Sequence, residues 1–106
     1  MSNFELKNMQ KGAHIHFIGI GGISMSGLAM IMLKNGYTVT GSDRTKSHIT
    51  KKLENLGATV FYAHKSENII GADLVVHTAA VHGDNPEIMA SKANNIPLII
   101  DNMCTK

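Results

Sequence analysis

The chain has 106 residues, of which 43% are hydrophobic, and a formal net charge of +2, which predicts one modest globular domain with a single apolar core. The basic residues are scattered and no apolar run approaches the roughly 18 residues of a membrane span, so the sequence predicts neither nucleic-acid binding nor membrane insertion. Cys104 is the only cysteine, which excludes an intrachain disulfide and fits a reducing compartment, and we interpret it as an incidental thiol.

The first half of the chain predicts an arm followed by two strand–helix pairs. Residues 1–12 are polar and mixed and predict a short arm, so the domain is expected over residues 13–106. A strand over 15–20 leads into a glycine-rich turn and then a helix over about 24–35, which Gly36 ends. Apolar residues gather on one face of this helix and beside it: Met25, Leu28, Ala29, Met32 and Leu33, then Met30 and Ile31. We therefore expect another domain or subunit to cover part of the helix.

The second half continues the alternation. The second strand, over 37–43, ends in an acid, Asp43, and Ser47 is placed to cap a helix that ends before Gly57. A strand over 58–62, a polar connection that contains His64, a helical turn over about 66–70 and a strand over 73–78 follow. Asn85 as N-cap and Pro86 as the first helical residue begin a last helix to about residue 94, before a fifth strand over 97–100.

Five strands joined by helical crossovers predict an α/β fold, a doubly wound parallel five-stranded sheet of the Rossmann-like kind. Ligands of such sheets bind beyond the carboxyl ends of the strands, where the strand order reverses. Residues 19–24, Asp43, His64 and residues 78–81 all follow strands. We expect these segments to share one edge of the sheet and to form one candidate site.

The glycine-rich turn carries the strongest functional signal. Gly19, Gly21, Gly22 and Gly27 directly follow the first strand, and such a turn lets backbone N–H groups and a helix N-terminus converge on a phosphate. The third glycine of a dinucleotide fingerprint is replaced by Ser24, which is small and placed to cap the helix. The pattern therefore indicates a phosphate without naming the molecule that carries it, and a tight turn without a ligand remains the alternative.

Asp43 and His64 are the candidate side chains near this turn. Asp43 follows Gly19 by 24 positions, close to the spacing at which dinucleotide folds place an acid against a ribose hydroxyl, although a turn aspartate would look the same. His64 could pack on a base or touch a sugar, or it is an exposed loop histidine. The other histidines lack metal-ligand spacing and are interpreted as structural or surface residues. Asp84 and Glu87 flank a helix start, where acids stabilise the helix dipole, so we interpret them as capping residues.

Several segments together resemble one family. The run from His16 to Gly22, then Met25-Ser26-Gly27, is similar to the opening of the Mur ligases. Further matches run in register, at Gly41-Ser42-Asp43, Leu56-Gly57-Ala58, His64, Ala79-Ala80-Val81, Asp84-Asn85-Pro86-Glu87 and Ile96-Pro97. They cover roughly residues 13–98 and are closest to the branch of the family that joins L-alanine to UDP-N-acetylmuramate. The combination is far more specific than the glycine motif alone.

The resemblance implies a role for each candidate residue. The glycine loop would cradle a diphosphate, Asp43 and His64 would lie near the uridine, and Thr78 and Ala79 would line the remaining wall. The loop comprises Gly19, Ile20, Gly21, Gly22, Ile23, Ser24, Met25, Ser26 and Gly27. No catalytic or metal-binding residue is expected in this chain.

The resemblance also implies a larger cytoplasmic enzyme of peptidoglycan synthesis. In that family an N-terminal domain holds the UDP part of UDP-N-acetylmuramate, a central domain carries ATP and Mg²⁺, and a C-terminal domain helps to bind the amino acid. This chain has no G-x-x-x-x-G-K-[ST] phosphate loop. We therefore expect an N-terminal domain that binds no cofactor of its own, packs against the missing central and C-terminal domains, and does not form the peptide bond alone.

The sequence departs from the family pattern at three places. Ser24 stands where the family usually has glycine, Ala63 replaces the glycine before the histidine, and Asp101-Asn102-Met103 follows where a basic residue is expected. Three alternatives also stay open. They are a regulatory NAD(H)- or FAD-binding module, the related ligase that recycles murein tripeptide, and a degenerate relative that binds nothing and supports assembly.

Overall fold

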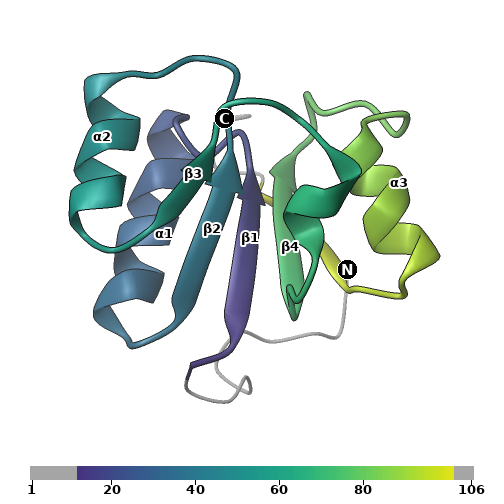
Figure 1. Cartoon of the computed structure of the whole chain (residues 1–106), viewed down its shortest axis with the longest axis horizontal. Helices are drawn as coiled ribbons and strands as arrows, with labels where there is room; N and C mark the ends of the chain where they lie inside the picture. The colour runs from purple at the N-terminus through teal and green to yellow at the C-terminus, as the bar shows by residue number, and fades with distance from the viewer. Residues whose placement is uncertain (1–11, 102–106) are drawn as a thin grey trace.

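The computed structural model describes residues 12–101, which form one parallel five-stranded sheet with helices on both faces (Figure 1). The strand order is β3-β2-β1-β4-β5, which confirms the predicted doubly wound α/β fold. The strands are β1 (His14–Ile18), β2 (Thr38–Ser42), β3 (Thr59–Phe61), β4 (Leu74–Thr78) and β5 (Leu98–Asp101). Of the predicted arm only Gly12 lies within the described residues, and Cys104 lies outside them.

Helices begin where local capping signals predict them, with one exception. In α2 (His48–Asn55) the Ser47 side chain accepts from the Thr50 amide and the Thr50 side chain accepts in return from the Ser47 amide. In α3 (Pro86–Ala93) the Asn85 side chain accepts from the Glu87 amide. These two predicted caps are confirmed.

The exception is α1 (Ile23–Lys34), which begins after an extended Gly22 with no side-chain cap. The prediction that Ser24 caps this helix is wrong, because Ser24 lies inside the first turn. Its hydroxyl instead donates to Asp101 Oδ2 at the end of β5, over 2.8 Å. A serine in place of glycine thus ties the start of α1 to an edge strand.

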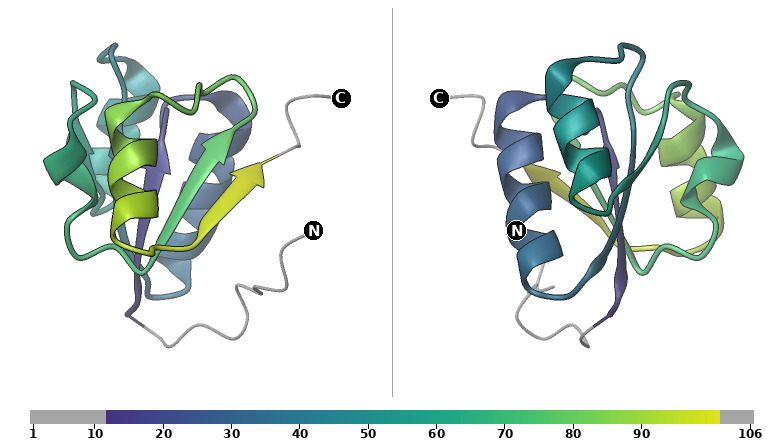
Figure 2. Two further views of the ribbon diagram at one scale, coloured as in Figure 1. Left: turned by 90° about the vertical axis from the view of Figure 1, so that its right-hand side faces the viewer. Right: turned by 60° about the vertical axis from the view of Figure 1, so that its left-hand side comes forward.

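The side chains of β1 alternate between the two faces of the sheet. Ile15 and Phe17 pack with Met25, Ala29 and Met32 of α1 and with Leu53 of α2 in one buried cluster. Ile18 packs on the other face with Ile69 and Ile88, which belong to the 3-10 helix η2 (Ser66–Ile69) and to α3. Figure 2 shows these two helical layers on opposite sides of the strands. His16, one residue from Ile15 and Phe17, therefore faces α3.

Candidate functional site

The carboxyl edge of the sheet collects the predicted segments. The strand order reverses between β1 and β4, and in Figure 1 the labelled strands point to the top of the view, where the following loops lie. Residues 19–22 follow β1, Asp43 follows β2, His64 follows β3, and Ala79 follows β4. The fold brings these residues to the edge at which doubly wound sheets bind their ligands.

Most amides of the glycine loop are used within the protein. Gly19 and Ile20 both donate to Ser42 O, over 2.7 and 3.0 Å, and Gly22 donates to Gly19 O. Gly19 adopts a φ of +81°, which explains the need for glycine there. Ile20 is fully buried, and its side chain lies where a Cβ on Gly41 would stand, 2.5 Å away. The loop is thus a tight turn between β1 and α1 whose first amides are bonded to the end of β2.

The first turn of α1 carries the amides that remain available. The Ser26 amide makes the first bond within the helix, to Gly22 O. The amides of residues 23, 24 and 25 precede it and form the positive end of the helix dipole. Met25 and Ser26 are buried, while Ile23 is 88% exposed. The backbone of this turn offers donors to an anion, beside the Asp101 carboxylate to which the Ser24 hydroxyl is bonded. The side chains of Ile20 and Met25 belong to the core.

Gly21 is packed against Asp43 rather than facing open space. Its amide donates to Asp43 Oδ2 over 2.9 Å, and a Cβ on Gly21 would lie 2.7 Å from the same oxygen. The other carboxylate oxygen, Oδ1, accepts from the Thr45 amide over 3.0 Å. Asp43 thus closes its own turn and clamps the glycine loop, and two of its roughly four lone-pair sites remain for another donor.

A cleft of about 770 Å³ opens between the loops that follow β2, β3 and β4. His64 is the predicted residue that lines it, and Ala80 and Val81, the next residues after Thr78 and Ala79, form part of the opposite wall. Arg44, which sequence reasoning did not single out, contributes a cation. The remaining lining residues are Tyr62, Ala63, His82, Asp84, Asn85 and Pro86.

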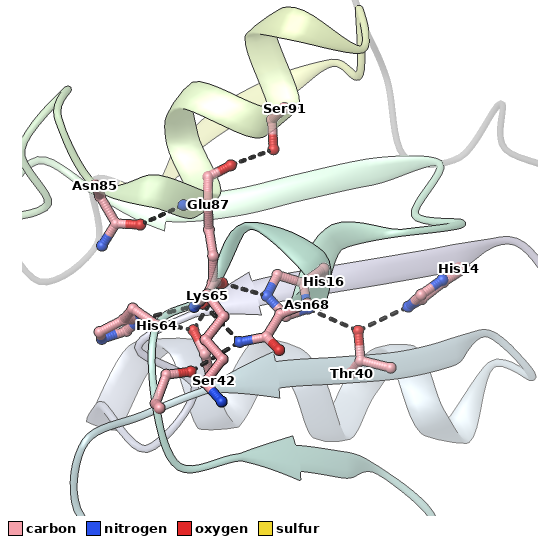
Figure 3. Close-up of polar contacts among 11 residues, drawn as sticks. His14, His16, Thr40, Ser42, His64, Lys65, Asn68, Asn85, Glu87 and Ser91 are labelled. Atoms are coloured by element: carbon pink, nitrogen blue, oxygen red, sulfur yellow. Dashed lines mark hydrogen bonds and ion pairs between the residues drawn. The ribbon is translucent and has the colours of Figure 1, made fainter.

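A buried polar network adjoins His64, which lies at its margin (Figure 3). The Glu87 side chain is fully buried and reaches from α3 towards the sheet. Its Oε1 accepts from His16 Nε2 over 2.6 Å and from Ser42 Oγ over 2.9 Å, and its Oε2 accepts from Asn68 Nδ2 over 2.9 Å. The backbone amide of Lys65 donates to Oε2 over 3.2 Å. Glu87 therefore joins α3, β1, β2 and the loop after β3.

The carboxylate of Glu87 is held in its ionised form. Burial raises its pKa, but hydrogen bonds from His16, Asn68 and Ser42 and the charge of His16 outweigh burial and lower the pKa below its ordinary value of 4.5. Glu87 is thus an acceptor for every group around it. Glu87 lies in the first turn of α3, as the sequence predicted. The prediction missed its second role, because the side chain points into the protein and accepts from buried donors.

The sequence contains one signal for this network, at His16. His16 occupies an inward-facing position in an apolar strand, and a buried imidazole requires a hydrogen-bond partner. That partner is Glu87, 71 positions away, so sequence spacing alone could not identify it. Across residues 12–101, no three histidine, cysteine or acidic side chains are arranged to hold a metal ion. No helix in the same range is long and apolar enough to cross a membrane.

Comparison with known proteins places the chain in a family. Residues 14–102 match the model described as "Mur ligase family, catalytic domain". A UDP-N-acetylmuramate–L-alanine ligase of Clostridium botulinum is 58% identical over 89 residues, which are 84% of this chain and 19% of that protein. The chain therefore spans about a fifth of the length of the curated relatives it matches.

Two solved structures have the same fold. The UDP-N-acetylmuramate–alanine ligase MurC of Thermotoga maritima superposes with a TM-score of 0.79 at 40% identity, over 82% of this chain and 20% of that one. The UDP-N-acetylmuramate:L-alanyl-γ-D-glutamyl-meso-diaminopimelate ligase of Neisseria meningitides superposes with a TM-score of 0.76 at 31% identity, over 83% of this chain and 28% of that one. The chain belongs to the Mur ligase family.

Proposed function

We propose that this chain is the UDP-binding N-terminal domain of a ligase that adds L-alanine to UDP-N-acetylmuramate. The observation that carries the proposal is its 58% identity, over 84% of the chain, to a UDP-N-acetylmuramate–L-alanine ligase. The chain is 31% identical to the UDP-N-acetylmuramate:L-alanyl-γ-D-glutamyl-meso-diaminopimelate ligase of Neisseria meningitides. That ligase is the second candidate, because both enzymes are named for substrates built on UDP-N-acetylmuramate.

The site geometry supports a division of the UDP group between two surfaces. The free amides in the first turn of α1 offer hydrogen-bond donors and the positive end of a helix to a diphosphate. The cleft beside His64 offers a cation from Arg44, an aromatic ring from Tyr62 and polar walls to a nucleoside. Thr78 ends β4 and Ala79 follows it, directly before the cleft residues Ala80 and Val81, and both are proposed as part of the wall.

The remaining chemistry belongs to parts of the enzyme beyond this chain. In the proposed reaction ATP phosphorylates the lactyl carboxylate of UDP-N-acetylmuramate, and the amine of L-alanine then displaces the phosphate. ATP and Mg²⁺ are proposed for the central domain and L-alanine for the C-terminal domain, in a cytoplasmic enzyme. This chain contributes binding and orientation of the UDP end, and we assign it no catalytic residue.

Calorimetric titration of the chain with UDP and, separately, with NADH tests this proposal. We expect UDP to bind and NADH to bind at least about tenfold more weakly, a difference of roughly 1.4 kcal/mol. The reverse order would favour a nicotinamide-binding module. Absence of binding by both nucleotides would favour a relative that supports assembly without a ligand.

A further inference from the structure

The tautomer of His64 follows from the hydrogen bonds beneath it. Ser42 Oγ lies 3.0 Å from His64 Nδ1 and donates its only proton to Glu87 Oε1, 2.9 Å away. Glu87 is ionised and has no proton to give. Ser42 Oγ can therefore only accept from His64, and the proton of this contact resides on Nδ1.

Glu87 reinforces this arrangement at two further points. Its Oε2 lies 3.4 Å from His64 Nδ1, so the carboxylate attracts the same ring N–H. The same oxygen accepts from the backbone amide of Lys65 and from Asn68, whose amide also donates to Ala63 O. Glu87 thus anchors both the ring of His64 and the loop that carries it.

Nε2, the second ring nitrogen of His64, faces away from the polar network. The N–H directions of an imidazole diverge, so a ring whose Nδ1 points down to Ser42 directs Nε2 away from the network. His64 lines the cleft and its side chain is 17% exposed. In Figure 3 the ring lies at the margin of the network, with only Nδ1 joined to it. A neutral His64 therefore presents an acceptor lone pair, not a donor, to the cleft.

We propose that Glu87 and Ser42 are positioning residues that hold His64 with Nδ1 protonated, so that Nε2 accepts a hydrogen bond from a donor group of the bound nucleoside. This inference rests on the proposed function for the identity of the ligand. A ribose hydroxyl and the uracil imide N–H are donors, whereas ionised phosphate oxygens are only acceptors. His64 would therefore distinguish the nucleoside end of UDP and contribute little to binding of pyrophosphate.

Long-range ¹H–¹⁵N correlation spectra of the histidine rings test the inference directly. The ¹⁵N-labelled chain is measured without ligand at about pH 8.5, well above the ordinary range in which an imidazole titrates, and His64→Asn identifies the His64 signals. We expect His64 with Nδ1 protonated, while His82, exposed in the same cleft, shows the Nε2-protonated form usual in water. An Nε2-protonated His64 would overturn the inference even if the protein binds UDP normally.

Matched variants test the positioning role. Glu87→Gln should move His64 towards the Nε2-protonated form and weaken UDP binding about tenfold, while pyrophosphate binding stays the same. Glu67→Gln removes an exposed carboxylate from η2 and should change neither the tautomer nor binding. If Glu87→Gln does not fold, Ser42→Ala removes the acceptor for Nδ1, and the spectrum of the unaltered chain still decides.

The failures of the two proposals are distinguishable. An Nδ1-protonated His64 whose Nε2 signal shifts on addition of UDP supports both. UDP binding with an unshifted His64 Nε2 signal overturns only the present inference. Absence of UDP binding by the unaltered chain overturns the proposed function, and with it the nucleoside as the partner of His64.

Discussion

At the scale of single residues, Asp43 connects the glycine loop with the end of β2. Its carboxylate accepts from the amides of Gly21 and Thr45. The structure therefore agrees with the interpretation of Asp43 as a residue that closes a turn. The proposed contact with uridine adds a third donor to the same carboxylate. Substitution of Asp43 separates these two roles.

Asp43→Asn should weaken UDP binding by roughly ten- to a hundredfold, because a hydrogen bond to a charged acceptor contributes about 1.5–3 kcal/mol. Inorganic pyrophosphate, which has no nucleoside, should bind as before or slightly better. Calorimetry on both ligands provides the measurement. If Asp43→Asn changes the affinities for UDP and pyrophosphate equally, Asp43 acts only as a turn residue.

Gly21→Val should destabilise the domain by about 1–3 kcal/mol and weaken UDP binding, because the new side chain displaces the Asp43 carboxylate. The effect is steric rather than conformational, since φ at Gly21 is not positive and a Cβ there would meet the Asp43 carboxylate. A double mutant with Asp43→Asn should lose less UDP affinity than the two single effects added together. Additive losses would contradict this coupling.

Glu87→Gln should lower the free energy of unfolding by roughly 2–4 kcal/mol near neutral pH, because its amide would face the donors of Asn68 and Lys65. Since the folded-state pKa of Glu87 is lowered from 4.5, its stabilising contribution is present above that value. The contribution is lost as the pH falls from there through the lower folded-state pKa.

Urea unfolding of both proteins, followed by circular dichroism at several pH values, measures this dependence. The stability difference between the original chain and Glu87→Gln should shrink as the solution is acidified below about pH 4.5. Glu67→Gln, an exposed change in η2, is the control and should leave stability nearly unchanged at every pH. A stability difference between the original chain and Glu87→Gln that is constant across this pH range would contradict the claim that the buried carboxylate is ionised in the folded protein.

At the scale of elements, local signals predicted most of the fold. Short stretches of sequence predicted the alternation of strands and helices. They also predicted the Ser47 cap and the helix start at Asn85-Pro86, because each signal lies within a few residues of the feature it predicts. Gly36 ends α1 with a φ of +88°, as expected for a residue just beyond a helix. Such features need no knowledge of distant contacts.

The remaining features depend on residues far apart in the sequence. The Ser24 hydroxyl bonds to Asp101, 77 positions away, and Ser42 bonds to Glu87, 45 positions away. The sequence therefore predicted which loops share the carboxyl edge but not which side chains are buried there. For the same reason it did not identify Arg44 as part of the cleft wall.

Gly27→Ala tests whether the last glycine of the loop acts as part of α1 alone. A Cβ at this position meets no atom within 4 Å, so the substitution should stabilise the domain by about 0.5–1 kcal/mol through helix propensity. Thermal unfolding measures that gain. Pyrophosphate binding should not change, because residue 27 lies beyond the free amides of the first turn. Weaker pyrophosphate binding would show that the ligand approaches the second turn.

At the scale of the whole molecule, the sheet explains why these groups meet. The order β3-β2-β1-β4-β5 places a helix N-terminus and three loops around one edge. The proposed binding groups, which are separated in sequence, therefore converge there. The outer surface of α1 keeps Ile31 52% exposed. The prediction that another domain or subunit covers this surface remains a prediction, and it agrees with a chain that spans about a fifth of its relatives.

The central claim is that the carboxyl edge of this domain binds the UDP end of UDP-N-acetylmuramate. Amide chemical-shift mapping during titrations with UDP-N-acetylmuramate and with UDP tests it most directly. We expect both ligands to shift residues 23–25 together with Arg44 and His64, and their affinities to agree within about tenfold, or roughly 1.4 kcal/mol. Shifts confined to the opposite edge of the sheet, or an affinity gap larger than tenfold, would contradict this account.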